Sequence, residues 1–371
     1  MEEVLYFDHA ASTAVHPDVV AEILPYFTTQ FANSESRSHV PGLTAASAVN
    51  SARTRIAHHL GTSPEEITFT SGATESINIA LQGIYERYSP YGKHIIVAKT
   101  EHKAVLDTVA YLEKKGAEVS YIGTDINGEI SVRELKNMIR KDTVLLAIMW
   151  VNNETGVFQN IGEISNLAHE HKIAFFSDLT QGIGKFPLQL SQLPIAAAAF
   201  SGHKIGAPKG VGILYLSRKN PRVQCAPITF GGNQENGMRP GTLNVPGIIG
   251  IAKALDTVDY QDIKRIEKYH TQLIEFFSSQ NCRINTSSSK KSPFILNITG
   301  PENCKARDLF KKNPRIAFSL GSACTSSSLK NSHVLLGMGL SDQEAERSFR
   351  LSINWSTSQD EIDFLIRNFK F

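Results

Sequence analysis

The stretch "KIAFFSDLTQ" (172–181) decides the fold that this sequence predicts, because an apolar run ends there abruptly in polar residues. Five further short apolar runs have strand-like composition and occupy residues 66–70, 94–100, 144–153, 195–202 and 210–217. Helical patterns separate them, such as 75–88, which places its apolar residues on one face. Near-continuous apolar strands that alternate with helices are covered on both faces. We therefore predict an α/β fold with a large, mostly parallel sheet.

The pattern changes after about residue 250. A helical stretch (247–279) leads into the polar run 285–292, and later come strands at 293–300 and 348–354 with a helix at 306–313 between them. Ser358 and Glu361 form the capping box of a last helix. We predict two domains: residues 12–250 form the large α/β domain, and residues 1–11 with 251–371 form a smaller α+β domain.

Composition narrows the class of protein. The 371 residues include 38 basic and 36 acidic ones, and this balanced charge argues against a dedicated nucleic-acid or membrane surface. The longest apolar runs are too short to span a bilayer, and the acidic start "MEEVLYFDHA" lacks a signal-peptide core. Four scattered cysteines without a CxxC pair predict neither disulfides nor a metal site. We expect a cytoplasmic protein.

Ligands of open α/β sheets bind beyond the carboxyl ends of the strands, so the polar residues there are site candidates. "SGATES" (71–76) follows a strand and opens a helix, whose free N–H groups suit a phosphate; a simple turn is the alternative. His102 follows the next strand and is either a structural residue or one that stacks on a flat ring and moves protons. Asn152 and Asn153 either hold a turn or face a ligand.

Two charged residues complete this set of candidates. Asp178 ends a fully apolar strand, where a carboxylate must pair with a cation or cap the next turn. Lys204, in "FSGHKIGAPKG" (200–210), directly follows another buried strand, where desolvation would lower its pKa and make a Schiff base feasible. A phosphate cradle, a stacking ring, an amide, a buried carboxylate and such a lysine are what pyridoxal 5'-phosphate needs.

Cys324 lies in "RIAFSLGSACTSSSLKN" (315–331), among serines, threonine and glycine. A structural cysteine is usually buried in apolar surroundings. The polar setting therefore favours a reactive thiol on a segment that can move.

These stretches together resemble the bacterial-type cysteine desulfurases of the class V aminotransferase family, which have fold type I of the pyridoxal phosphate enzymes. The resemblance runs from "YFDHAAST" (6–13) to the last helix and is carried by "FTSGATES", "EHKAVLDT", "VNNETG", "SGHKIGAPKG", "GMRPGTLN" and "GSACTSSSL". One departure is "DLTQ" (178–181), where Thr180 replaces the small residue that this family has against the cofactor ring.

The resemblance implies a role for each candidate. Lys204, His102 and Cys324 would be catalytic, and Asn33 and Arg350 would bind the substrate carboxylate. The cofactor would be held by Ala73, Thr74, His102, Asn153, Asp178, Gln181, Ser201, His203 and Lys204, joined by Thr242 from a second subunit of a homodimer.

The implied reaction converts L-cysteine to L-alanine and leaves a persulfide on Cys324, whose sulfur then passes to an acceptor protein. The chain ends at "IRNFKF", without the tail by which housekeeping desulfurases engage the iron–sulfur scaffold. Iron–sulfur cluster assembly, tRNA thiolation and DNA phosphorothioation are therefore comparable destinations for the sulfur. No direct nucleic-acid or membrane partner and no metal are expected.

Two other functions stay open on the sequence. A selenocysteine lyase or an aminotransferase would use the same cofactor, although an aminotransferase needs no thiol such as Cys324. A non-catalytic partner protein could also keep the fold, but it would have no use for Lys204, Asp178, His102 and Cys324 together.

Overall fold

The structure is a computed structural model, and it describes residues 4–219, 221–286, 290–320 and 331–371. Its largest element is a seven-stranded sheet. In spatial order the strands are β2 (Ile67–Thr70), β8 (Gly212–Leu216), β7 (Ala197–Ser201), β6 (Ala174–Asp178), β5 (Thr143–Ala147), β3 (His94–Ala98) and β4 (Glu118–Ile122). The pairs from β7 to β4 are parallel, whereas β8 runs antiparallel to both of its neighbours. The predicted α/β fold with a large, mostly parallel sheet is confirmed.

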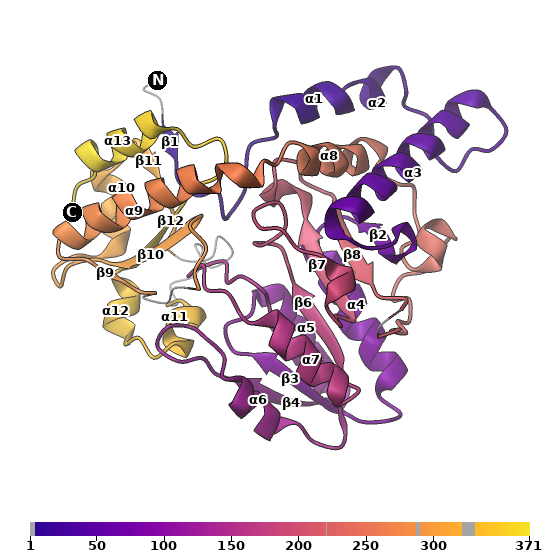
Figure 1. Cartoon of the computed structure of the whole chain (residues 1–371), viewed down its shortest axis with the longest axis horizontal. Helices are drawn as coiled ribbons and strands as arrows, with labels where there is room; N and C mark the ends of the chain where they lie inside the picture. The colour runs from indigo at the N-terminus through magenta and orange to yellow at the C-terminus, as the bar shows by residue number, and fades with distance from the viewer. Residues whose placement is uncertain (1–3, 220, 287–289, 321–330) are drawn as a thin grey trace.

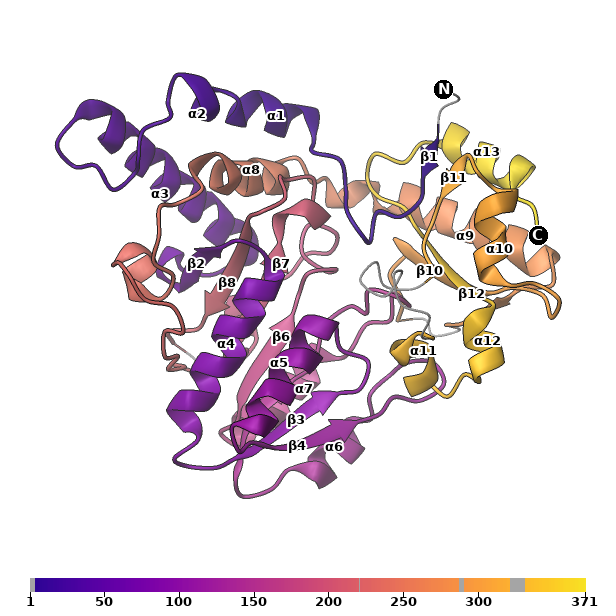
Figure 2. The ribbon, with the colours of Figure 1, turned by 180° about the vertical axis from the view of Figure 1, so that it is seen from behind.

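Helices cover both faces of this sheet (Figures 1 and 2). Along β3, Ile95 and Val97 join a core with α4 (Ala73–Tyr88) and α5 (Lys103–Lys114), whereas Ile96 and Ala98 join a second core on the opposite face. The helices of that opposite face are α3 (Val40–Leu60), α6 (Val132–Met138), α7 (Ile161–Glu170) and α8 (Val245–Asp256). Because successive side chains of a strand point to opposite faces, strands buried on both sides must be apolar throughout.

The C-terminal part forms a separate core around two small sheets, coloured orange to yellow in Figure 1. One is antiparallel, in the order β12 (Ser348–Ser352), β10 (Ile295–Thr299) and β9 (Arg283–Ile284). The other pairs β1 (Leu5–Tyr6) with β11 (Ile316–Ala317) in parallel, so the N-terminal strand lies with the C-terminal elements. The helices of this part are α9 (Ile263–Ser279), α10 (Ala306–Lys312), α11 (His333–Gly337), α12 (Asp342–Glu346) and α13 (Gln359–Asn368).

The C-terminal helices follow the sequence signals in part. The Ser358–Glu361 capping box is present at the start of α13, with the Ser358 side chain accepting from the Glu361 N–H. The helical stretch predicted at 247–279 is instead two helices, α8 and α9, separated by a short 3₁₀ turn (Tyr260–Asp262). Helices α1 (Pro17–Ile23) and α2 (Pro25–Thr28) precede α3 and each begin at a proline, the position where a missing N–H costs nothing. The domain boundaries at residues 11/12 and 250/251 stay a prediction.

Candidate active site

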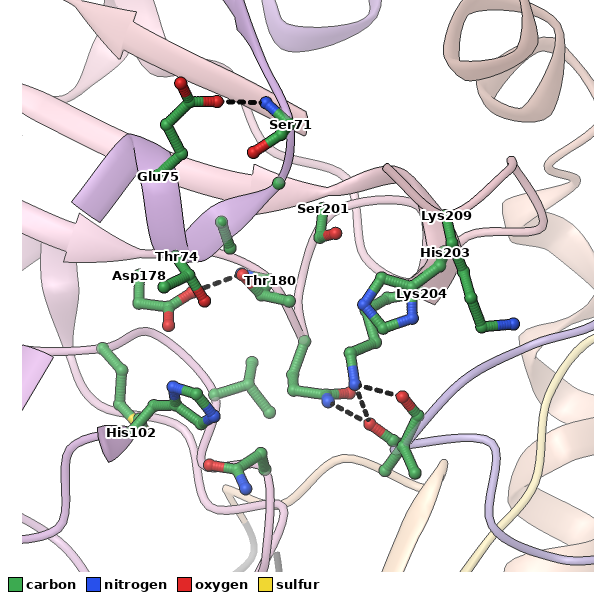
Figure 3. Close-up of a pocket in the computed structure, with 18 of the residues that line it drawn as sticks. Ser71, Thr74, Glu75, His102, Asp178, Thr180, Ser201, His203, Lys204 and Lys209 are labelled. Atoms are coloured by element: carbon green, nitrogen blue, oxygen red, sulfur yellow. Dashed lines mark hydrogen bonds between the residues drawn. The ribbon is translucent and has the colours of Figure 1, made fainter. Parts of the chain in front are cut away.

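One cavity of about 400 Å³ lies beyond the carboxyl ends of the central strands (Figure 3). Ten of the predicted site residues line it: Ala73, Thr74, His102, Asn153, Asp178, Gln181, Ser201, His203, Lys204 and Arg350. They come from the loops after β2, β3, β5, β6 and β7 and from β12, so segments far apart in the sequence meet at one edge of the sheet.

Two predicted residues lie elsewhere, and a third is not among the residues that the structure describes. Asn33 and Thr242 are exposed and do not line this cavity. Cys324 lies outside the described residues, so its predicted role stays a prediction. The roles of Asn33 and Thr242 also stay predictions.

The end of the cavity that suits a phosphate is formed where α4 begins. The first N–H groups of a helix have no partner within it, and α4 starts at Ala73 directly in the cavity wall. Gly72 brings this turn against β7 and β8: a Cβ atom built on Gly72 would lie 3.5 Å from Ser201 Oγ, and one on Gly212 would lie 2.4 Å from the Gly72 Cα atom. The missing side chains therefore allow a close approach that leaves helix N–H groups, Ser201 and His203 around one anion-sized space.

Lys204 is held by the N-terminal segment of the chain. Its Nζ donates to the carbonyl oxygens of Ala10 and Ala11, both at 2.6 Å (Figure 3). Ala10 O also accepts from Gln181 Nε2 at 2.9 Å, so this carbonyl joins two predicted cofactor residues. The sequence offered no signal for Ala10 and Ala11, because both contribute backbone atoms.

Asp178 and His102 share the opposite wall. The Asp178 carboxylate is 6% exposed and accepts from the Thr180 N–H at 2.9 Å, so it caps the next turn and also lines the cavity. His102 caps α5 through Nδ1, which accepts from the Ala104 N–H. Burial lowers the His102 pKa, and Lys204 and His333 lower it further, whereas Asp178 acts to raise it. A neutral imidazole is thereby favoured, which can accept a proton.

The two asparagines after β5 have different tasks. Asn152 is buried and holds the turn, since its Oδ1 accepts from the N–H groups of Glu154 and Thr155 and its Nδ2 donates to Thr100 O. Asn153 lines the cavity, and its carbonyl accepts from Arg350 Nη1 at 2.8 Å. Asn152 therefore holds the turn, whereas contact of Asn153 with a ligand stays a prediction.

Arg350 is 1% exposed although it carries a guanidinium. Its Nη2 pairs with Asp8 Oδ1 at 2.5 Å, whereas its Nε is buried with no hydrogen-bond partner among the described residues. A buried N–H without a partner is costly and points to an acceptor that a ligand supplies. The arrangement fits an anionic substrate group beside Asn153.

The described part of the chain offers neither a metal cluster nor a membrane span. It contains no group of three or more histidine, cysteine or acidic side chains that could hold a metal ion. None of its helices is both long and apolar enough to cross a bilayer.

Comparisons with known proteins show what this chain is similar to. Residues 5–365 match the profile of the aminotransferase class-V family. A protein of Pectobacterium carotovorum named cysteine desulfurase IscS is 41% identical over 99% of this chain and 92% of its own length. Among solved structures, a NifS-like protein has a TM-score of 0.91 at 32% identity, covering 98% of this chain and 97% of that one. SspA in complex with cysteine has a TM-score of 0.85 at 35% identity, with 94% and 98% covered.

Proposed function

Because the chain belongs to the class V aminotransferase family, we propose that it is a pyridoxal 5'-phosphate-dependent cysteine desulfurase. The observation that carries the proposal is the single cavity that holds Lys204, Asp178, His102 and Arg350 together. The IscS relative is named a cysteine desulfurase and SspA was solved in complex with cysteine, so both relatives support the same substrate. The overall fold is that of the NifS-like proteins, which is fold type I.

The residues present fit the cofactor. A cavity of about 400 Å³ accommodates a substituted pyridine ring, and the start of α4 with Ser201 and His203 suits its phosphate. Asp178 would face the ring nitrogen and keep its proton, and Lys204 would carry the covalent bond to the protein. Bound there, the cofactor supplies an electron sink that accepts negative charge from the substrate.

The other residues then bind substrate and move protons. Arg350, oriented by Asp8 and Asn153 O, would bind the carboxylate of L-cysteine through its remaining N–H groups. His102, whose pKa is lowered, would take up and return protons beside Lys204.

Sulfur transfer closes the reaction. Cys324 attacks the sulfur of the substrate as a thiolate, the carbon–sulfur bond of cysteine breaks, and a sulfur–sulfur bond forms. The products are L-alanine and a persulfide on Cys324, so the reaction needs no external oxidant. An acceptor protein would then take the outer sulfur, in iron–sulfur cluster assembly, tRNA thiolation or DNA phosphorothioation.

A homodimer is part of the proposal. Thr242 is exposed in the single chain, which fits a residue that acts at a neighbouring subunit's cavity. Large apolar side chains are exposed in the same N-terminal segment as Asn33, namely Leu24, Phe27, Phe31, Val40 and Leu43. A second copy of the chain would cover them. We place the protein in the cytoplasm on the strength of the scattered, unpaired cysteines.

The experiment compares wild type with Cys324→Ala after reconstitution with pyridoxal phosphate. Wild type is expected to release alanine and sulfide from cysteine under reducing conditions. Cys324→Ala is expected to lose sulfide release while it keeps the visible absorbance of the bound cofactor. Undiminished sulfide release by Cys324→Ala would contradict the proposal, as would a wild-type protein that transfers amino groups to α-keto acids instead.

A further inference from the structure

Lys185 is a buried lysine to which the proposed reaction assigns no task. Only 4% of it is exposed, and its Nζ donates to Gln181 Oε1 at 2.6 Å. No carboxylate of the described residues forms an ion pair with it, and the centre of the Phe294 ring lies 5.8 Å from Nζ. Burial lowers its pKa to about 7, and Lys204 and Arg350 contribute in the same direction. An amine in such a position lowers folding stability, which calls for another reason for its presence.

That reason lies in the hydrogen bonds that Gln181 makes. Gln181 Nε2 donates to Ala10 O, and the same carbonyl accepts from Lys204 Nζ. A carbonyl can only accept, so the amide nitrogen of Gln181 must face Ala10 and its oxygen must face Lys185. The amide nitrogen carries two hydrogens, of which one is used on Ala10. Gln181 lines the cavity, so the second hydrogen can serve a ligand there.

We propose that Lys185 is a positioning residue that holds the Gln181 amide with its N–H toward the cofactor. The inference rests on the proposed function and deepens it. Gln181 is 3% exposed, so without Lys185 its oxygen would be buried with no donor. One of the two hydrogen bonds that fix the amide would then be lost, and Ala10 O alone would keep its N–H toward an oxygen of the cofactor ring.

The charges around Lys185 support this role. Lys204 and Arg350, on the cavity side, both lower the Lys185 pKa. Lys185 in turn lies near His9, whose pKa is lowered to about 4 first by burial and then by Lys185. On the other side, a second cavity of about 300 Å³ is lined by both lysines and by Asp259 and Asp262. Lys185 therefore lies between cationic groups on the cavity side and two carboxylates of the second cavity.

The test measures binding of pyridoxal phosphate to the cofactor-free protein. Lys185→Met removes the donor and is expected to weaken binding about tenfold, within the range for an unpartnered buried acceptor. Lys185→Gln keeps an N–H donor without the charge and is expected to stay within about threefold of wild type. Lys253→Met, at a lysine that pairs with Glu22 on α1, is the matched control and is expected to bind normally.

A double-mutant cycle decides whether Lys185 acts through Gln181. In a Gln181→Ala protein, Lys185→Met is expected to cause no further loss of affinity. The pH dependence of the cofactor's visible absorbance should likewise shift in Lys185→Met and not shift further in the double variant. Equal losses in both backgrounds, or an Lys185→Gln protein as weak as Lys185→Met, would overturn the inference. A wild-type protein that binds no pyridoxal phosphate would instead overturn the proposed function.

Discussion

Thr180 brings a hydroxyl into the cavity wall at the place where this family has a small residue. Its Oγ1 is buried and has no hydrogen-bond partner among the described residues, which is unfavourable. We expect Thr180→Ala to bind pyridoxal phosphate about two- to fivefold more tightly and to shift its visible absorbance. Thr180→Val, which keeps the shape and loses the hydroxyl, separates the effect of the hydroxyl from the effect of side-chain size. Titration of cofactor-free protein measures both, and unchanged affinity and absorbance in Thr180→Ala would refute the expectation.

His270 on α9 makes the stability of the protein depend on pH. Its pKa is lowered to about 4, first by burial and then by Lys291, and its Nε2 has no partner among the described residues. Between pH 6.5 and 4 the unfolded chain binds a proton here that the folded chain excludes, so the free energy of unfolding falls as the pH falls. From pH 7 to 5 this one residue should account for roughly 1–2 kcal/mol of the loss.

Urea unfolding at pH 7 and pH 5 measures that loss. His270→Gln is expected to show a smaller difference between the two pH values than wild type, whatever its absolute stability. His169→Gln, at an exposed position on α7, is the control and should keep the wild-type difference. Equal differences in His270→Gln and wild type would show that the proton is bound elsewhere.

At the level of single residues, the sequence identified side chains and missed supporting contacts. Ten predicted residues line one cavity because each lies in a strand or in the segment that follows one, and the strands of the large sheet end at the same edge. The residue pattern alone could not tell Asn152 from Asn153, since adjacent asparagines differ only in which way the turn points them, and only the family resemblance singled out Asn153. Lys185 gave no signal either, because its burial results from tertiary packing.

The short helix α11 is tied to the large sheet through the residue that caps it. Ser332 Oγ accepts from the Leu335 N–H as the helix cap and donates to Glu154 Oε2 at 2.5 Å. Glu154 is fully buried, and its other oxygen has no partner among the described residues. Removal of the hydroxyl therefore costs a cap and leaves a buried carboxylate without this donor.

We expect Ser332→Ala to lower the free energy of unfolding by about 2–4 kcal/mol. Ser341→Ala is the matched control, because Ser341 also caps a short helix, α12, but bonds only the half-buried Glu344. That control should lose about 1 kcal/mol. Urea unfolding compares the two, and equal losses would mean that the Glu154 contact contributes nothing.

Strands could be predicted from the sequence where burial requires their residues to be apolar. The buried strands β3 and β6 are largely apolar runs, and their start or end lies within two residues of the prediction. β4 was missed because it is an edge strand of sequence EVSYI with mostly exposed or half-buried residues. The run predicted at 144–153 extends beyond β5, since residues 148–151 remain buried after leaving the regular sheet.

The proposed dimer accounts for apolar surface on the whole molecule. Phe31 is 75% exposed and Val40 is 74% exposed, on either side of the predicted substrate residue Asn33. We expect Phe31→Glu with Val40→Glu to give a monomer, because burying two carboxylates at an interface is unfavourable. Light scattering after size exclusion measures the change.

Loss of the dimer should also weaken cofactor binding, because Thr242 would no longer reach a neighbouring cavity. Tyr91→Glu is a suitable control, since Tyr91 is 80% exposed but lies far along the chain, after α4. A double variant that stays dimeric, or one that is monomeric with unchanged cofactor affinity, would contradict this arrangement.

The cavity is lined by segments from both ends of the chain, which the ribosome synthesises at different times. Ala10 and Ala11 hold Lys204, whereas Arg350 on β12 closes the same space. All seven strands of the large sheet lie between these two segments, because β2 begins at Ile67 and β8 ends at Leu216. A nascent chain can therefore build the large sheet and its lysine well before the substrate-binding wall exists. The part of the chain that would hold the cofactor is thus synthesised before the part that would bind the substrate.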